Sequence, residues 1–115
     1  IQGMGWLTME ECIWDRNGKL LTHGPSTYKI PVAGDIPEHF KVSLFDGENV
    51  KPTPYRSKAV GEPPLMLALS VWLAIRDAVS AAADHRAIPQ IDAPATPERI
   101  LKAVDDARAR AAASR

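Results

Sequence analysis

The chain has 115 residues, 45% of them hydrophobic, which is enough for one small domain or part of one. Its fourteen basic and fourteen acidic residues cancel, which argues against a protein that grips nucleic acid or an anionic membrane by charge. The single cysteine, Cys12, excludes an internal disulfide and fits a reducing compartment. Because the sequence starts at Ile1 within a helical pattern, we expect it to be the C-terminal piece of something longer.

Residues 1–12 are expected to form a short helix, whose helical spacing is carried by Met4, Leu7 and Glu11. Gly3 and Gly5 each weaken a helix by about 1 kcal/mol relative to alanine. Their presence therefore suggests that the backbone packs closely against another element. Cys12, at the end of this segment, is expected to be a buried and unreactive thiol.

The following segments predict β-structure. Asn17-Gly18 lies between Ile13–Arg16 and Lys19–Thr22 and predicts a β-hairpin, because both central residues of a type I′ turn need positive φ. His39–Phe45 alternates apolar and polar residues, which predicts a half-buried strand. The proline-bounded segment His23–Pro31 is either a packed loop, which we favour, or the wall of a pocket.

The longest apolar run, Leu65–Ile75, predicts a helix buried on nearly all sides. The run exceeds the usual length of a strand, and only Ser70 interrupts it. It is too short, and too soon followed by charges, to span a membrane. Pro63 and Pro64 indicate where the helix starts, since proline suits the first helical turn.

Glu62 is the candidate functional residue at this helix start. A residue before proline avoids the helical region, so Glu62 should be extended and just outside the helix. Gly61 should permit a turn that a residue with a Cβ would resist. The helix dipole favours an ionised carboxylate here, which suits a base or an anion ligand. Acidic residues also gather at helix starts for this reason alone, and the local sequence by itself favours that plain structural role.

Other charged residues offer weaker signals. Arg56 and Lys58 lie close in sequence to Glu62 and either steady a negative substrate or cofactor group or are simply solvated. The three histidines lie in separate segments without metal-binding spacing, so we expect no self-contained zinc site; they are His23, His39 and His85.

Thr96-Pro97-Glu98 predicts the start of a last helix, with a hydroxyl N-cap, a proline and an acid in the first turn. Its narrow apolar stripe consists of Ile100, Leu101 and Val104, and residues 109–115 are expected to fray. The predicted fold class is therefore α+β. It comprises an N-terminal short helix, a β-hairpin and a further strand, one long buried helix and a C-terminal amphipathic helix.

Several stretches also resemble a known family. Ser57–Leu65, with Gly61-Glu62-Pro63-Pro64 at its centre, resembles the C-terminal signature of the molybdenum-binding subunit of the xanthine dehydrogenase family. Further segments resemble the same family and follow its order along the chain. They are Gln2–Gly5 with Thr8–Glu11, His23–Pro31 with Gly34–Pro37, and Ala93–Ile100. Aldehyde oxidases and carbon monoxide dehydrogenases share the Gly-Glu pair but usually vary the residues after it. The resemblance thus favours the xanthine branch, with aldehyde oxidation as the near alternative.

The resemblance implies that residues 1–115 are the C-terminal portion of the molybdopterin-binding domain of a xanthine dehydrogenase-like enzyme. Such an enzyme hydroxylates xanthine or hypoxanthine at a ring carbon with oxygen from water. Glu62 would be the general base that takes the proton of a molybdenum-bound hydroxide, as hydride passes to a sulfido ligand. Gly61 is a candidate cofactor-binding residue. Electrons would leave through 2Fe-2S clusters and FAD to NAD, all held outside this chain.

The partners implied are a purine substrate, the remaining parts of the molybdenum subunit and an iron–sulfur/FAD domain or subunit. The intact enzyme would be a cytoplasmic oligomer of purine catabolism, without nucleic acid or membrane partners. Most cofactor-contacting family residues lie upstream, so we expect this chain alone to bind no molybdenum cofactor stably and to be inactive. Alternatively, the chain is a non-catalytic assembly module whose long apolar helix pairs with other parts of the subunit or with another copy.

Overall fold

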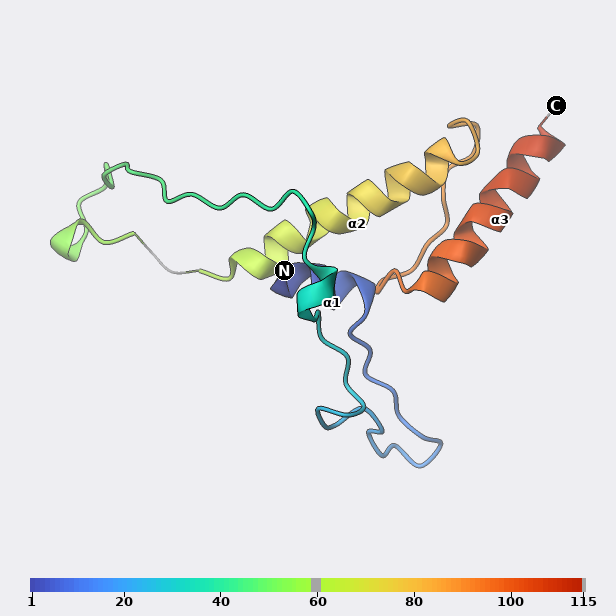
Figure 1. Cartoon of the computed structure of the whole chain (residues 1–115), viewed down its shortest axis with the longest axis horizontal. Helices are drawn as coiled ribbons and strands as arrows, with labels where there is room; N and C mark the ends of the chain where they lie inside the picture. The colour runs from blue at the N-terminus through green and yellow to red at the C-terminus, as the bar shows by residue number, and fades with distance from the viewer. Residues whose placement is uncertain (59–60, 115) are drawn as a thin grey trace.

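The computed structural model describes residues 1–58 and 61–114, and its longest elements are three α-helices (Figure 1). Helix α1 spans Gln2–Thr8, α2 spans Pro63–Ala81 and α3 spans Pro97–Ala113. Two 3-10 turns, η1 at Ala33–Asp35 and η2 at Pro54–Arg56, lie in the long connection between α1 and α2. The predictions of a short first helix, a long central helix and a C-terminal helix are confirmed.

The predicted α+β class is wrong, because the described residues contain no strand, and the β-hairpin is reduced to one bridge. Trp14 and Leu20 form an isolated antiparallel bridge around the turn. Only Gly18 of the two central residues has a positive φ, of 79°, so the turn is not type I′. The carboxylate of Asp15 accepts hydrogen bonds from the backbone amides of Asn17 and Lys19, at 2.8 and 2.9 Å. These local bonds hold the turn without continuing into a strand ladder.

The further strand predicted at His39–Phe45 is also absent from the described structure. This segment runs as an extended arm that projects away from the helices (Figure 1). Its apolar residues face solvent, and Leu44 is 95% exposed. A strand needs a neighbouring strand and a core to cover one face, and alternation in the sequence supplies neither.

Helix α2 begins where the two prolines predict, but the prediction that it is buried on nearly all sides is wrong. Only Ala68 and Val79 are buried. Leu65, Met66 and Leu67 are 57%, 68% and 65% exposed. The other helices cover two narrow patches of α2, and most of its apolar surface has no neighbour in the described chain.

Helix α2 is also longer than the apolar run on which the membrane prediction rested. By length and composition alone, this 19-residue helix would suffice to cross a membrane, since an 18-residue window of it has a mean hydropathy of 1.4. The helix continues through Arg76 and Asp77, which had argued against a span. The core helix of a soluble protein can have this composition, so the feature assigns no membrane role by itself.

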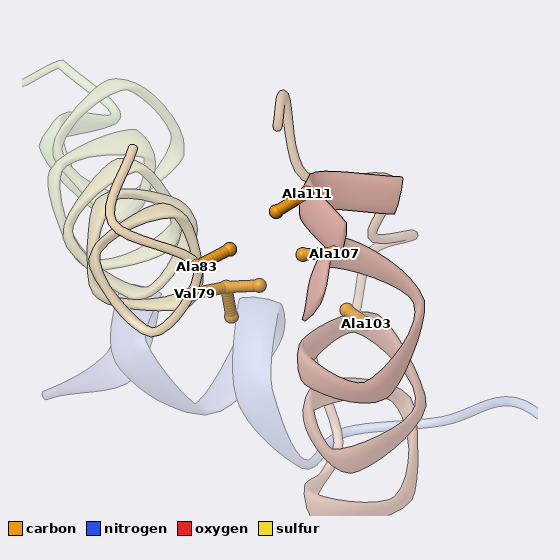
Figure 2. Close-up of a cluster of buried hydrophobic side chains, with 5 residues drawn as sticks. All are labelled: Val79, Ala83, Ala103, Ala107 and Ala111. Carbon is orange, nitrogen blue, oxygen red and sulfur yellow. The ribbon is translucent and has the colours of Figure 1, made fainter. Parts of the chain in front are cut away.

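Helices α2 and α3 meet through small side chains (Figure 2). The buried cluster consists of Val79, Ala83, Ala103, Ala107 and Ala111. Alanines at every fourth position of α3 lie on one face and let the two backbones approach. Ile100 and Val104 pack beside this cluster, whereas Leu101 of the predicted stripe is exposed.

The prediction for the start of α3 is confirmed, and the prediction for its end is wrong. The predicted N-cap is confirmed, because Oγ1 of Thr96 accepts the backbone N–H of Arg99 at 3.5 Å. The predicted fraying from residue 109 is wrong, because the helix continues to Ala113. Ala111 is buried against α2, and Arg110 donates to the carbonyl of Ile88 at 2.9 Å, so both hold the last turns.

Helix α1 crosses α2 closely at Gly3, as its glycines predict. A methyl group added at Gly3 would lie 2.7 Å from the carbonyl oxygen of Pro64 and 2.9 Å from Cβ of Ala68. Gly5 similarly faces Pro31, whose Cδ would lie 2.5 Å from an added methyl group. The two glycines therefore let the backbone of α1 lie directly against α2 and against the segment 23–31, with no side chain between them.

The described chain is less compact than a globular domain of similar length. Its radius of gyration is 18.9 Å and its extents are 60 × 42 × 27 Å. A compact domain of 100 residues has a radius of gyration of about 13 Å. The excess reflects the projecting loops between α1 and α2, which Figure 1 shows on two sides of the helices.

A hydrogen bond joins the segment 23–31 to the residues after α1. The phenol of Tyr28 donates to Oε2 of Glu10 at 2.5 Å. This bond, with smaller effects of burial and of the negative charge on Glu10, raises the pKa of Tyr28 to about 12. The stability that it contributes is therefore present below the ordinary tyrosine pKa of about 10. It is lost as the pH rises through the raised pKa.

We predict that Glu10→Gln lowers the pKa of Tyr28 towards its ordinary value, because the variant removes the negative charge. The measurement is a titration of phenolate absorbance in a Tyr55→Phe background, which leaves Tyr28 as the only tyrosine. Glu11→Gln is the matched control, since Glu11 pairs with Arg99 instead, at 2.9 Å. An unchanged titration in Glu10→Gln would show that the charge of Glu10 does not raise the pKa of this phenol.

Candidate active site

Glu62 lies at the N-cap of α2, just outside the helix, as predicted. Its backbone has φ −109° and ψ 62°, so it leaves the helical region without being fully extended. Its carbonyl accepts the backbone N–H of Leu65 at 3.1 Å, which closes the first turn. The side chain makes no capping hydrogen bond and is exposed. The carboxylate is therefore available to a ligand.

The reason given for Gly61 is not confirmed. An added methyl group at Gly61 would meet nothing within 4 Å among the described residues. A residue with a Cβ would thus be accepted at this position in the described structure. The motif Ser57–Leu65 includes Ala59 and Val60, which lie outside the described residues, so its path is described only on either side of them.

The two cations before Glu62 are engaged elsewhere. Arg56 forms an ion pair with Glu48, and the ammonium of Lys58 donates to the carbonyl of Gly47. Lys58 also lies over the ring of Phe45, 5.1 Å from its centroid. Both cations are therefore exposed to solvent, as one of the two alternatives had it, and they also contact the preceding loop.

Two of the stretches that carry the family resemblance meet beside Glu62. A cavity of about 360 Å³ lies where α1 crosses α2, and Gln2, Gly3, Pro63 and Pro64 belong to its lining. Pro63 directly follows Glu62, so the carboxylate lies at a residue adjoining this cavity. The sequence suggests close packing at Gly3, but it does not indicate that the first turn of α2 is the partner.

The segment His23–Pro31 has both of the properties considered for it. Backbone bonds from Thr27 and Tyr28 to the carbonyl of Gly24, at 2.9 and 2.8 Å, make it an ordered turn. Part of it also lines a cavity of about 410 Å³. Cys12, expected to be buried, is exposed because residues 10–15 leave α1 along the surface.

The described residues do not fit the ligand set of a metal ion. Within residues 1–58 and 61–114, no group of three or more His, Cys, Asp or Glu side chains comes together. What the site does offer is an exposed carboxylate next to a mostly apolar cavity, whose lining includes Gly3, Pro63 and Pro64.

Comparison with known proteins gives consistent relatives. Residues 1–37 match the model of the molybdopterin cofactor-binding domain. The chain is 51% identical to xanthine dehydrogenase/oxidase of Rattus norvegicus over 111 residues and 51% identical to that of Mus musculus over 112 residues. It is 44% identical over 109 residues to a nicotinate hydroxylase of Emericella nidulans.

Each of these alignments covers 92% of this chain. In the other direction, the chain spans only 8% of the length of the two xanthine dehydrogenase/oxidases and 7% of the nicotinate hydroxylase. Over most of its length the chain is therefore similar to one segment of xanthine dehydrogenases and a nicotinate hydroxylase, and its first 37 residues match a molybdopterin cofactor-binding domain.

Proposed function

We propose that residues 1–115 are the C-terminal portion of the molybdopterin-binding domain of a molybdenum hydroxylase, in which Glu62 is the general base. The observation that carries the proposal is the packing of Gly3 against Pro64, which joins two family-like motifs beside an exposed carboxylate. A base must reach its proton and be held in a defined place. Exposure supplies the first condition, and the proline start of α2 supplies the second.

In the proposed reaction, Glu62 takes a proton from the water-derived oxygen that attacks an electron-poor ring carbon. The molybdenum–pterin cofactor supplies the two-electron redox chemistry when it is bound. Residues 1–37 match a molybdopterin cofactor-binding domain, and we expect further parts of the protein to complete the cofactor site. We also propose Gly61, next to the base, as a cofactor-binding residue; the open space where its Cβ would lie supports close approach of a ligand.

The proposed substrate is xanthine or hypoxanthine. The relatives are named for xanthine and nicotinate, which are both nitrogen heterocycles. This favours a heteroaromatic substrate over the alternative of an aldehyde oxidase-type hydroxylase. Electrons then pass to 2Fe-2S clusters, FAD and NAD, in a cytoplasmic oligomer that includes the iron–sulfur/FAD domain or subunit.

We predict that Glu62→Gln slows single-turnover reduction of the full-length enzyme by xanthine about a hundred- to ten-thousandfold, the usual contribution of a general base. The amide is close in size to the carboxylate but cannot take the proton. The rate is measured by rapid mixing at matched molybdenum content, so that loss of cofactor does not enter the comparison.

Glu98→Gln is the matched control, because Glu98 is an acid in the first turn of α3. The account predicts that this variant keeps the parent rate. If Glu62→Gln also keeps that rate, Glu62 is only a helix-end acid and the proposed role is withdrawn.

The exposed apolar face of α2 supports a second function, that of an assembly module. Leu65, Leu69 and Leu73, spaced four residues apart, lie on one face of α2 and each expose half or more of their surface. Large contiguous apolar patches mark interaction surfaces in soluble proteins. The zero net charge of the chain puts little repulsion between two copies.

We predict that the isolated chain self-associates through this face. Sedimentation should give an apparent mass that rises with concentration, and Leu65→Gln with Leu69→Gln should weaken the rise. Leu101→Gln, at an exposed leucine of α3, is the control and should leave it unchanged. A monomer at all concentrations would count against the assembly function while leaving the role of Glu62 untouched.

A further inference from the structure

A cavity of about 700 Å³ lies between α2, α3 and the residues 89–92 that lead from one to the other. This volume is within the range of about 300–1,000 Å³ typical of small-molecule sites. Its lining includes Trp72 and five charged residues, Arg76, Asp92, Arg99, Lys102 and Asp106. None of these residues lies in the Glu62 segment or in the cavity beside it.

Two of the charged groups are already paired within the chain. Arg99 contacts Glu11 at 2.9 Å and donates to the carbonyl of Pro94 at 2.7 Å. Asp106 accepts from Arg110 at 2.6 Å. Their charges are therefore largely satisfied by neighbours.

The remaining cations are not neutralised in this way. Among the described residues, neither Arg76 nor Lys102 forms an ion pair, and Asp92 does not reach either of them at ion-pair distance. Two cationic groups thus face one cavity with a single unpaired carboxylate in its lining. The balance favours a guest with negative charge.

Trp72 supplies an independent sign that an acceptor belongs here. Its indole N–H is buried and has no hydrogen-bond partner among the described residues. Leaving such a donor unsatisfied costs about 1–3 kcal/mol, so buried polar groups normally have a partner. The guanidinium of Arg76 lies over the same indole, 5.9 Å from the ring centroid. The indole donor and this cation are therefore neighbours, so an anion held by Arg76 would lie near the indole N–H.

We propose that this cavity binds a small oxyanion, a phosphate or a carboxylate, through the indole N–H of Trp72 and the cationic groups of Arg76 and Lys102. The spacing of the residues makes this possible. Trp72 and Arg76 are four residues apart and share one face of α2, while Lys102 lies on the facing helix. The anion joins α2 to α3 beside the alanine contact that already holds them.

The test follows the indole N–H resonances of the ¹⁵N-labelled 115-residue chain during titration with inorganic phosphate or, separately, with acetate at constant ionic strength. The chain has three tryptophans, and Trp72→Phe identifies the resonance of Trp72. We expect a saturable shift of that resonance alone. Saturation by phosphate only, or by acetate only, identifies the kind of oxyanion that the site accepts.

Lys102→Gln should weaken binding roughly tenfold or more, because a hydrogen bond to a charged group contributes about 1.5–3 kcal/mol. Lys19→Gln, in the exposed turn, is the matched control and should bind as the parent does. The proposal is overturned if neither anion gives a saturable shift, or if Lys102→Gln binds as tightly as Lys19→Gln.

Discussion

The contact between Gly3 and the first turns of α2 is the constraint on which the described structure depends. It leaves no room for a side chain between α1 and the carbonyl of Pro64. Helix α1 is short, and its C-terminal end is anchored by a second contact, the 2.6 Å hydrogen bond from the amide of Ala95 to the carbonyl of Leu7. The seven-residue helix α1 thus contacts both the start of α2 and the segment that leads into α3 (Figure 1).

Small residues also allow close packing at the contact between α2 and α3. Ala103, Ala107 and Ala111 bring α3 against Val79 and Ala83, so the buried cluster is formed by short side chains (Figure 2). The leucines and Met66 of α2 lie elsewhere and remain exposed. A helix that packs through alanine and exposes leucine is typical of a segment whose apolar face is covered by further protein. This division of roles links the fold to the proposal that the activity requires the rest of the subunit.

The helix starts could be predicted from sequence because their signals are local. Pro63-Pro64 and Thr96-Pro97 act on their own backbone, and the structure places α2 and α3 accordingly. The absence of strands could not be predicted, because the alternation at His39–Phe45 does not reveal whether a pairing strand exists. The prediction that α2 is buried was wrong for the same reason, since the composition of a helix does not reveal what covers it.

The candidate site was predictable to a similar degree. The position of Glu62 outside α2 follows from the prolines, whereas its neighbours follow from tertiary contacts that no local pattern encodes. The hydrogen bond of Tyr28 to Glu10 joins residues 18 apart, and the buried indole of Trp72 looks like any apolar helix residue in the sequence. Gly61 shows the converse, because a motif glycine need not be required by the local backbone.

The most direct test of this account is the free energy of unfolding of Gly3→Ala, measured by urea denaturation followed by helical circular dichroism. Alanine in place of glycine normally stabilises a helix by about 1 kcal/mol. Here the added methyl group would collide with backbone, so we predict a loss of about 1–3 kcal/mol. Gly34→Ala is the control, since a methyl group there meets nothing within 4 Å. A Gly3→Ala chain as stable as the parent, or more stable, would contradict the central role of this contact.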